Sequence, residues 1–505
     1  MSDARISETR DTTPQALEAR GSNRSQRPTS AAFKAFIAED WASPPESLRV
    51  LSSVAGHTPR RREAVSARFP GERLVLPAGS LKVRSNDSDY RFRPHSAFAH
   101  LTGLGTDREP DAVLVLDPVG ATAEGHEAVL YFRPRAGRDT EEFYASARYG
   151  ELWVGARPSL EEVEAELGIA CRHVDELEAG LSKDVGTDGV RVRVVPGSDL
   201  AVEAMVSASR GEAGSVEADA ELAEFCSELR LVKDEFEIAQ MRLAVEASGR
   251  GFADIVRALP EAVDHERGER VVETVFASRA RREGNGPGYD TIAAAGDHAC
   301  TLHWIRNDGV VRPGELVLVD AGVEVDSLYT ADVTRTLPVD GVFTDAQRRV
   351  YQAVLDAADA AFAVARPGSK FRDLHDAAMR VIADRLAGWG LLPVSAEESL
   401  DVENGGYHRR WMVHGTSHHL GIDVHDCAQA RREMYLDAVL EPGMVFTIEP
   451  GLYFKADDVS VPAELRGIGV RIEDDVLLTA DGCENLSGML ARAPEDVEAW
   501  MASLR

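Results

Sequence analysis

The chain has 505 residues, of which 44% are hydrophobic and 28% are charged, and this length is enough for roughly two to four domains with sizeable cores. Its 56 Lys and Arg against 85 Asp and Glu give a net charge of −29, which argues against a sequence-independent nucleic-acid binder because such proteins rely on a basic surface. No stretch approaches the about 20 consecutive apolar residues of a membrane-spanning helix, so we expect neither a nucleic-acid nor a membrane partner.

The first 30 residues are rich in Ser, Thr, Arg, Glu and Gln and contain almost no large apolar side chains. Such a segment cannot bury enough apolar surface to offset the entropy of ordering it, so we expect residues 1–30 to be a disordered tail. They also lack the apolar region of a secretory signal, and the chain's five cysteines are scattered without C-x-x-C spacing. We therefore expect a cytoplasmic protein without a disulfide framework.

Residues 31–210 alternate helix and strand signals, and we predict an α/β domain here. A helical segment opens the domain at residues 31–40. Ser159 followed by Glu162 is a capping box, which indicates the N-terminus of a further helix. Apolar runs typical of strands lie at residues 74–76, 113–116 and 129–132.

Residues 211–230 are predicted to be a linker, because the stretch 211–218 is mostly small and polar. The second domain, residues 231–505, opens with a long helix whose apolar residues fall on one face: Ile238, Met241, Val245, Phe252 and Ile255. Another helix follows Thr344, where Gln347 completes a capping box. Strong strand signals lie at residues 315–320, 333–339, 444–448 and 470–479.

Several catalytic motifs are absent from the sequence. It contains no G-x-S-x-G elbow, no G-x-x-x-x-G-K-[ST] loop and no G-x-G-x-x-G, which weakens serine-hydrolase and nucleotide-binding interpretations. His414 and His418 have the H-x-x-x-H spacing of zincins, but Gly415 stands where that motif requires the catalytic Glu. A zincin is therefore excluded.

Four carboxylates instead lie at the ends of apolar strands or inside them: Asp320, Asp332, Glu449 and Glu473. A hairpin that joins residues 315–320 to 333–339 would set the two aspartates side by side, where they repel each other. Buried carboxylates without a compensating charge would take up protons or destabilise the fold. The four carry −4, which two divalent ions would balance, and His418 would favour Mn²⁺, Co²⁺ or Zn²⁺ over Ca²⁺.

Each of these residues has a simpler explanation when it is taken alone. Asp320 and Asp332 could be turn formers, because Asp is common beside a glycine such as Gly322. Glu473 could pair with Arg471 on the same strand, and Glu449 could merely end a strand. Three further histidines would singly be ordinary surface or core imidazoles, namely His303, His414 and His425.

Taken together, the segments resemble the signature blocks of a known family. GYDTIAAAGDHACTLHW, VDAGVEVDSLYTADVTRTLPVDGVFT, HGTSHHLGIDVHD, EPGMVFTIEPGLY and RGIGVRIEDDVLLT are similar to the blocks of the pita-bread metallopeptidases, in the branch of Xaa-Pro aminopeptidase (aminopeptidase P) and prolidase. This likeness covers about residues 230–495, and RSNDSDYRFRPHSAFAHLTGL resembles the start of that branch's N-terminal domain. Two departures are His419, where the family's aminopeptidases carry Trp, and a hairpin between Asp320 and Asp332 that is one residue longer than in bacterial relatives.

The resemblance implies a site with two divalent metal ions, which we expect to be Mn²⁺, held by Asp320, Asp332, His418, Glu449 and Glu473. In the family, Asp332 and Glu473 would bridge the ions, a hydroxide between them would attack the scissile carbonyl, and Glu449 would move a proton. The residues that match the family's substrate-binding positions are His303, His414 and His425. Those that match a hydrogen-bonding set behind the metals are Arg471, Tyr453 and Asp87.

The predicted fold is therefore mixed α/β (α+β), with an N-terminal α/β domain followed by a C-terminal pita-bread metallopeptidase domain. The predicted function is release of the N-terminal residue from peptide substrates with proline at position two. The alternatives are a prolidase, which acts on Xaa-Pro dipeptides, and a non-enzymatic peptide-binding module with the same fold. The resemblance also implies a homo-oligomer, either a dimer or a tetramer.

Overall fold

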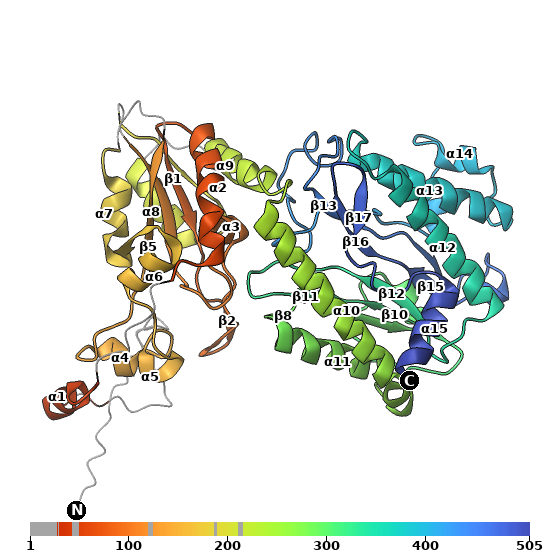
Figure 1. Cartoon of the computed structure of the whole chain (residues 1–505), viewed down its shortest axis with the longest axis horizontal. Helices are drawn as coiled ribbons and strands as arrows, with labels where there is room; N and C mark the ends of the chain where they lie inside the picture. Colours follow the sequence, from red (N-terminus) through yellow and green to blue (C-terminus); the bar gives the residue numbers. More distant parts are fainter. Residues whose placement is uncertain (1–27, 29, 43–49, 120–124, 186–188, 211–215) are drawn as a thin grey trace, which may run out of the picture.

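The computed structural model describes residues 28, 30–42, 50–119, 125–185, 189–210 and 216–505. Figure 1 shows two lobes, an N-terminal lobe that ends with helix α9 and a larger C-terminal lobe that begins with helix α10. The predicted disordered tail, residues 1–30, lies outside the described residues except for positions 28 and 30. No helix in the described part of the chain combines the length and the apolar character needed to cross a membrane.

The N-terminal lobe is built on a five-stranded mixed sheet with the strand order β6-β5-β4-β1-β7. Its strands are β1 Arg73–Pro77, β4 Val113–Pro118, β5 His126–Phe132, β6 Ala170–His173 and β7 Val192–Val194, beside a small hairpin of β2 Val83–Ser85 and β3 Ser88–Asp89. Its helices are α1 Ala31–Ala38, α2 Thr58–Arg68, α3 Ser96–Thr102, α4 Glu141–Ala145, α5 Glu151–Val154, α6 Leu160–Leu167, α7 Leu177–Ser182, α8 Leu200–Arg210 and α9 Val216–Glu228.

Helices cover both faces of this sheet (Figure 1). Leu74 and Leu76 pack with α2, α3, α6 and α9, whereas Val75, between them, packs with α7 and α8. A sheet that is buried on both faces has nearly continuous apolar strands, which is why β1, β4 and β5 could be found in the sequence. Strands β6 and β7 were not predicted, and β6 is a partly exposed edge strand. The capping box is also confirmed, since Ser159 accepts from the backbone N–H of Glu162 at the start of α6.

Residues 211–230 were predicted to be a linker, but most of this stretch is helical. The structure describes it from residue 216 onward. Residues 216–228 form helix α9, and its Leu222 and Cys226 are buried in the core of the N-terminal lobe. The prediction rested on the small polar residues at its start, and these precede an amphipathic helix rather than continue as an open joint. Five of the residues, 211–215, lie outside the described part of the chain.

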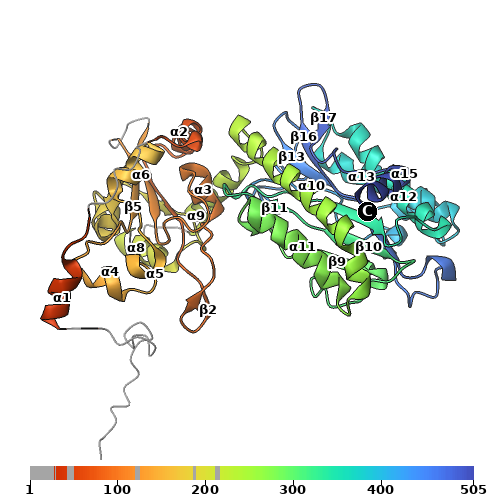
Figure 2. The ribbon, with the colours of Figure 1, turned by 60° about the horizontal axis from the view of Figure 1, so that its bottom comes forward.

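The C-terminal lobe places its strands between two pairs of helices, α10 with α11 and α12 with α13 (Figures 1 and 2). Its helices are α10 Glu235–Asp264, α11 Gly268–Glu283, α12 Asp345–Val364, α13 Phe371–Gly388, α14 Ala396–Leu400 and α15 Pro494–Leu504. Its strands are β8 Gly286–Pro287, β9 Ile292–Ala295, β10 Leu316–Asp320, β11 Val323–Glu324, β12 Thr334–Pro338, β13 Val445–Ile448, β14 Gly451–Phe454, β15 Ile468–Arg471, β16 Asp474–Leu478 and β17 Cys483–Asn485. The main sheets have the orders β12-β10-β9 and β13-β16-β17.

The segment 470–479 forms two strands rather than the single strand predicted. Strand β15 pairs with β14, and β16 pairs with β13 and β17, so the chain passes from one sheet to another at residues 472–473. At this point the backbone N–H of Glu473 donates to the carbonyl of Thr334, 3.1 Å away. Both strands are buried and the break between them has no glycine or proline, so the strand-forming residues on either side predict one strand, although Glu473, Asp474 and Asp475 interrupt the apolar residues.

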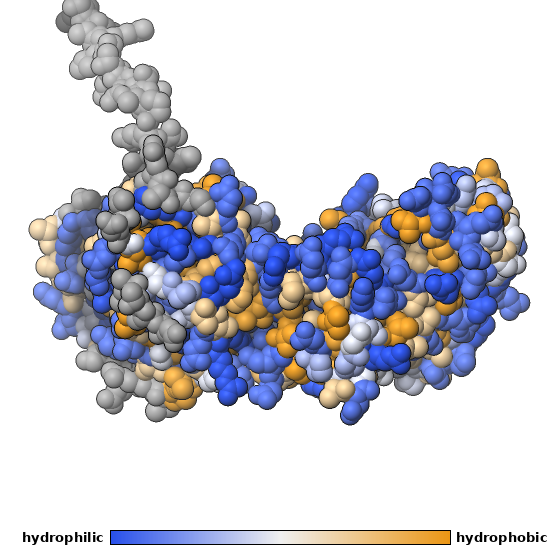
Figure 3. Space-filling view, turned by 90° about the horizontal axis from the view of Figure 1, so that it is seen from above, coloured by the Kyte–Doolittle hydropathy of each residue, from blue (hydrophilic) through white to orange (hydrophobic). Residues whose placement is uncertain are grey.

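Polar contacts join the two lobes. Arg61 of α2 donates to Asp234, which caps α10, with Nη2 and Oδ2 2.8 Å apart. Arg93 of the N-terminal lobe pairs with Glu324 of β11 at 2.8 Å, and the Ser96 hydroxyl donates to Asp423 at 2.7 Å. Figure 3 shows hydrophilic side chains, with apolar ones beside them, where the lobes meet on the face in view.

Arg335 of β12 joins the sheets of the C-terminal lobe and gives a prediction about stability. Its guanidinium is fully buried, pairs with buried Asp474 at 2.6 Å and donates to the carbonyl of Glu473 at 2.7 Å. Because Arg335→Met would leave a buried carboxylate short of one partner, we expect it to lower the free energy of unfolding by about 3–5 kcal/mol. Urea denaturation followed by tryptophan fluorescence measures this.

The matched control is Arg250→Met, which removes the half-exposed arginine of the ion pair with Glu283. Exposed pairs contribute about 0–1 kcal/mol, so this variant should unfold close to the wild type. Equal stability of the Arg335→Met and Arg250→Met proteins would contradict the role of Arg335 in the core.

Candidate active site

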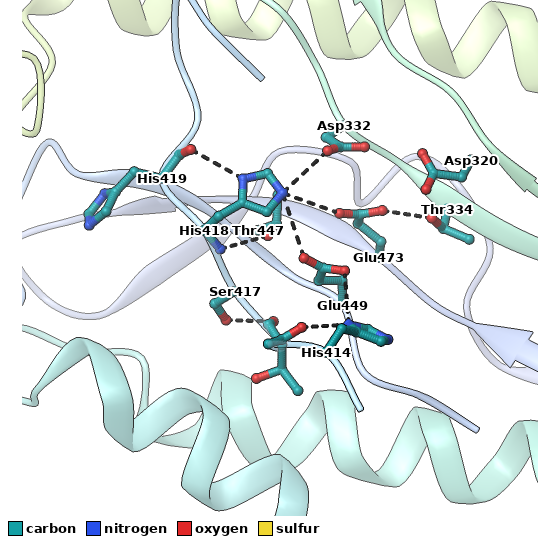
Figure 4. Close-up of polar contacts among 12 residues, drawn as sticks. Asp320, Asp332, Thr334, His414, Ser417, His418, His419, Thr447, Glu449 and Glu473 are labelled. Atoms are coloured by element: carbon teal, nitrogen blue, oxygen red, sulfur yellow. Dashed lines mark hydrogen bonds and ion pairs between the residues drawn. The ribbon is translucent and has the colours of Figure 1, made fainter. Parts of the chain in front are cut away.

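The side chains predicted to bind metal or substrate all line one cavity of about 320 Å³ in the C-terminal lobe. Figure 4 shows most of them converging from separate strands and loops. The predicted residues in the lining are His303, Asp320, Asp332, His414, His418, His425, Glu449, Arg471 and Glu473, which Leu302, Gly415 and Ser417 complete.

Asp320 and Asp332 come together through the pairing of strands β10 and β12. Asp320 ends β10 and lies opposite Thr334 in antiparallel register, and Asp332 precedes Thr334 by two residues. Just beyond Asp320, the backbone at Gly322 approaches the backbone at Ala331 so closely that a Cβ atom on Gly322 would lie 1.5 Å from the carbonyl oxygen of Ala331. Gly322 therefore serves this close approach, and the turn-forming explanation for Asp320 is wrong because Asp320 belongs to a strand.

The other ligand candidates reach the cavity from the second half of the domain. Glu449 directly follows β13, and Glu473 lies at the passage between β15 and β16. The loop that carries His418 runs alongside β13, where the Thr447 N–H donates to the carbonyl of His418 at 2.9 Å. Both halves of the lobe thus contribute to one site, and distant parts of the sequence meet there.

His418 lies at the centre of the carboxylates. Its Nε2 is 3.3 Å from Asp332 Oδ2, 3.6 Å from Glu449 Oε1 and 4.0 Å from Glu473 Oε1 (Figure 4). Its Nδ1 lies 3.2 Å from the carbonyl oxygen of His419, so this nitrogen carries the proton and leaves Nε2 free to coordinate. Ligand atoms of Asp332, His418 and Glu473 all lie within 4.8 Å of one another, a spacing that fits one metal ion.

The ionisation of the carboxyl groups also fits a cation. Burial raises the pKa of Asp332 well above its usual range, and the neighbouring Asp320 adds to the shift. Burial and the charges of Asp332 and Glu449 raise the pKa of Glu473 in the same way. Burial likewise raises the pKa of Glu449 to about 7, against the opposing effects of His418 and Arg471. A divalent cation would stabilise the ionised carboxylates that the bare protein disfavours.

Arg471 is the buried cation beside these groups. Its Nη2 lies 2.5 Å from Asp320 Oδ2, its Nε donates to Thr334 at 3.1 Å, and its Nη1 donates to the Tyr453 hydroxyl at 3.2 Å. Burial alone would lower the pKa of the Arg471 guanidinium, but Tyr453, Asp320 and Glu473 together raise it more strongly. The pKa therefore lies well above its ordinary value, and Arg471 stays charged. The simpler explanation of Glu473, an ion pair with Arg471 alone, is not sufficient. Arg471 makes its ion pair with Asp320, and Glu473 accepts a hydrogen bond from Thr334.

Two residues at the site, Tyr289 and Thr334, were not predicted from the sequence. The Tyr289 hydroxyl donates to Asp320 Oδ1 at 2.8 Å and is also within hydrogen-bonding distance of Asp332. The Thr334 hydroxyl donates to Glu473 Oε2 at 2.6 Å. Both hold a carboxylate in place from behind. A lone Tyr and a strand Thr carry no sequence signal of this role.

The three predicted substrate-binding histidines differ in their environments. His414 Nε2 is 2.7 Å from the Tyr453 hydroxyl, and burial together with Arg471 lowers the pKa of His414 to about 3. His425 is more exposed, and its ring centre lies 4.5 Å from that of His418. Burial, His418 and His303 lower the pKa of His425. His303 is exposed at the edge of the cavity.

Asp87 and His419, which the sequence analysis singled out, both lie outside the cavity. Asp87 lies in the exposed turn between β2 and β3 of the N-terminal lobe and does not line the cavity, whereas Arg471 and Tyr453 are buried in the C-terminal lobe. His419 is fully buried outside the cavity, where its ring stacks on Phe371 with centres 4.5 Å apart. That position therefore holds a packed aromatic ring, which accounts for a large residue there.

Comparisons with known proteins match both lobes. A model of the aminopeptidase P N-terminal domain matches residues 58–192, and a model of metallopeptidase family M24 matches residues 239–480. The chain is 53% identical over 451 residues to Xaa-Pro aminopeptidase 1 of Streptomyces coelicolor, which covers 89% of this chain and 88% of that protein. It is 50% identical over 473 residues to Xaa-Pro aminopeptidase 2 of the same organism, with 94% and 96% covered.

The fold is also similar to a solved structure of zinc-substituted Escherichia coli aminopeptidase P in complex with product. The two superpose with a TM-score of 0.76 at 32% sequence identity, over 90% of this chain and 99% of the other.

Proposed function

The chain belongs to metallopeptidase family M24, among its Xaa-Pro aminopeptidases, and from this premise we propose that it releases the N-terminal residue from peptides whose second residue is proline. It is a metal-dependent aminopeptidase with an aminopeptidase P N-terminal domain and a pita-bread catalytic domain. The alternatives of a prolidase and of a non-enzymatic binding module are not favoured, because the relatives that match most of the chain are named Xaa-Pro aminopeptidases.

The observation that carries the proposal is the convergence of the expected metal ligands and substrate-binding histidines on a single cavity. We propose that two divalent ions bind there, with Mn²⁺ as the expected metal, through Asp320, Asp332, His418, Glu449 and Glu473. Bound divalent metal lowers the pKa of water and polarises a carbonyl, which is the chemistry that peptide hydrolysis requires. The oxygen-rich donor set with one imidazole suits such ions.

The chain's own residues have distinct proposed roles around that chemistry. Glu449 is placed to move a proton, since it lines the cavity and its Oε2 is 3.6 Å from His414 Nδ1. The exposed rings of His303 and His425 lie at the cavity edge, where they can contact a peptide. Both ring nitrogens of neutral His414 are engaged within the protein, Nδ1 with the carbonyl of Gly415 at 2.6 Å and Nε2 with the Tyr453 hydroxyl at 2.7 Å, so a hydrogen bond to substrate requires His414 to exchange one of these partners.

The surroundings of the cavity favour peptides longer than two residues. A dipeptidase must recognise the free carboxylate just beyond proline, normally with a positioned Arg or Lys. Arg409 and Arg410, the nearest candidates in sequence, are exposed and do not line the cavity. Arg410 is already paired with Asp458 at 2.8 Å, and Arg409 donates to the carbonyl of Val413.

We expect a tripeptide Xaa-Pro-Yaa to be cleaved with higher kcat/KM than the corresponding Xaa-Pro dipeptide. Replacing proline with alanine at the second position should lower kcat/KM at least about tenfold, or ~1.4 kcal/mol of transition-state stabilisation. Side-by-side assays of the three peptides at saturating Mn²⁺ measure both effects. Preference for the dipeptide would instead assign the enzyme to the prolidases.

We further propose that the enzyme is a homo-oligomer, either a dimer or a tetramer, as the family resemblance implies. All five of its cysteines are free thiols, which suits a reducing compartment such as the cytoplasm.

A further inference from the structure

The segment that carries His303 has little regular structure of its own. It leaves strand β9 at residue 295, makes a short 3-10 turn over Gly296–Cys300 and continues irregularly to residue 309. His303 lies within this segment and is exposed at the edge of the metal-site cavity. Because an irregular exposed segment has many accessible conformations, a fixed position for His303 needs an anchor elsewhere.

Glu269 provides such an anchor from the first turn of helix α11. Its side chain is fully buried, and its carboxylate accepts four hydrogen bonds from the segment that carries His303. Oε1 accepts from the Ala295 N–H at 2.8 Å and from His298 Nδ1 at 2.7 Å. Oε2 accepts from Trp304 Nε1 at 2.8 Å and from the Gly309 N–H at 2.6 Å.

The bonded groups span the whole segment, from its first residue to its last, and include the direct neighbour of His303. Trp304 is further fixed by stacking on the His298 ring, with ring centres 3.8 Å apart. Gly309 is needed for the close approach, since a Cβ there would lie 2.7 Å from Glu269 Oε2. The N-terminus of α11 also favours a negative charge at this position.

Only a carboxylate satisfies these four donors. A glutamine has one accepting oxygen, and its amide nitrogen would face a backbone N–H with donor against donor in either orientation, that of Ala295 on one side or that of Gly309 on the other. Burial makes such a mismatch costly, because a donor without an acceptor keeps its full desolvation penalty. The substitution Glu269→Gln therefore releases one side of the segment while the side chain keeps its size.

From this arrangement we infer that Glu269 is a positioning residue for catalysis, which holds the segment 295–309 so that His303 meets the peptide in a fixed orientation. The inference rests on the proposed function, in which His303 contacts the substrate. Glu269 itself neither lines the cavity nor belongs to the metal-ligand candidates. Its effect must therefore pass through the segment, and through His303 in particular.

The experiment is a double-mutant cycle on kcat/KM for an Xaa-Pro-Yaa tripeptide, with Glu269→Gln, His303→Ala and both together in the Mn²⁺-loaded protein. We expect Glu269→Gln to lower kcat/KM about ten- to hundredfold at unchanged metal content, the effect typical of a misplaced catalytic contact. In the His303→Ala background the same substitution should change kcat/KM less than about twofold, because the group that it positions is gone.

The control is Glu266→Gln, the same chemical change at an exposed position just before α11, which should leave kcat/KM unchanged. Trp304→Phe is measured in parallel in both backgrounds, since it removes one N–H donor but keeps an aromatic ring. Trp304→Phe should lower kcat/KM less than Glu269→Gln does, and this loss should likewise disappear in the His303→Ala background. This second variant keeps the test decisive if Glu269→Gln lowers the yield of folded protein.

An equal loss from Glu269→Gln and Trp304→Phe in the presence and absence of His303 would overturn the inference and assign Glu269 a purely structural role. A His303→Ala protein with wild-type kcat/KM would overturn it as well. Failure of the proposed function looks different, because the wild-type protein would then not cleave Xaa-Pro-Yaa peptides at all.

Discussion

Removal of divalent metal is expected to lower peptide hydrolysis at least about a thousandfold, since a metal brings the pKa of water from about 15.7 to about 7. The described residues of the cavity offer carboxylates, imidazoles, the guanidinium of Arg471, which is held by Asp320, and the hydroxyl of Ser417, which donates to the carbonyl of Thr416 at 2.6 Å. None of these groups is an activated Ser or Cys nucleophile. Without metal, the carboxyl groups of Asp332 and Glu473 also tend to hold protons because of their burial and mutual repulsion.

The measurement is the turnover of an Xaa-Pro-Yaa peptide after exhaustive dialysis against a chelator, with residual metal determined by elemental analysis. Circular dichroism of the dialysed protein controls for unfolding, and addition of Mn²⁺ should restore activity. Undiminished turnover by verified metal-free protein would refute the assignment of the whole site.

Glu473→Ala is expected to lower both metal content and turnover, whereas His425→Ala should keep its metal and lose mainly kcat. Glu473 is buried within the group whose ligand atoms lie within 4.8 Å of one another, and the Thr334 hydroxyl fixes its orientation. Its removal takes away a ligand that the site cannot replace, so we expect at least about a hundredfold lower turnover, in line with losses seen for metal-site groups. His425 lies beside His418 but outside that group.

Elemental analysis and steady-state kinetics on the two variants give the contrast, with Glu441→Ala as a control for the loss of an exposed carboxylate. If Glu473→Ala bound as much metal with unchanged affinity, the ligand role of Glu473 would be wrong. If His425→Ala lost its metal, His425 would have to be counted among the groups that support the ions.

The strands and helix starts that the sequence revealed share a local physical cause. The capping boxes at Ser159 and Thr344 satisfy N–H groups at helix starts through side chains three residues apart, so they can be read without tertiary structure. Strand β10 could be read because burial on both faces keeps it apolar up to Asp320. The carboxylates of the site were visible for the same reason, as charges at the ends of apolar runs.

The features that escaped prediction depend on contacts between distant segments. The passage between β15 and β16 depends on which sheets the two strands join, because β15 pairs with β14 whereas β16 pairs with β13. Tyr289 acts only because β9 and β10 bring its neighbourhood against Asp320. Glu269 lies 34 positions from His303 in the sequence and is indistinguishable there from a solvated glutamate near the start of a helix.

The close approach of Gly322 to Ala331 divides the β10–β12 hairpin into a base, which carries the two aspartates, and a distal part, and the two parts have different roles. In the base, the pairing of Asp320 with Thr334 fixes the spacing of the two aspartates. In the distal part, Glu324 is paired with Arg93 of the other lobe, so this part serves as a tether between domains. A hairpin built in this way tolerates a change of length at its tip, because added residues cost little loop entropy and lie past the point that sets the spacing. Evolution can thus adjust how the domains connect while the chemistry at the base of the hairpin is left untouched.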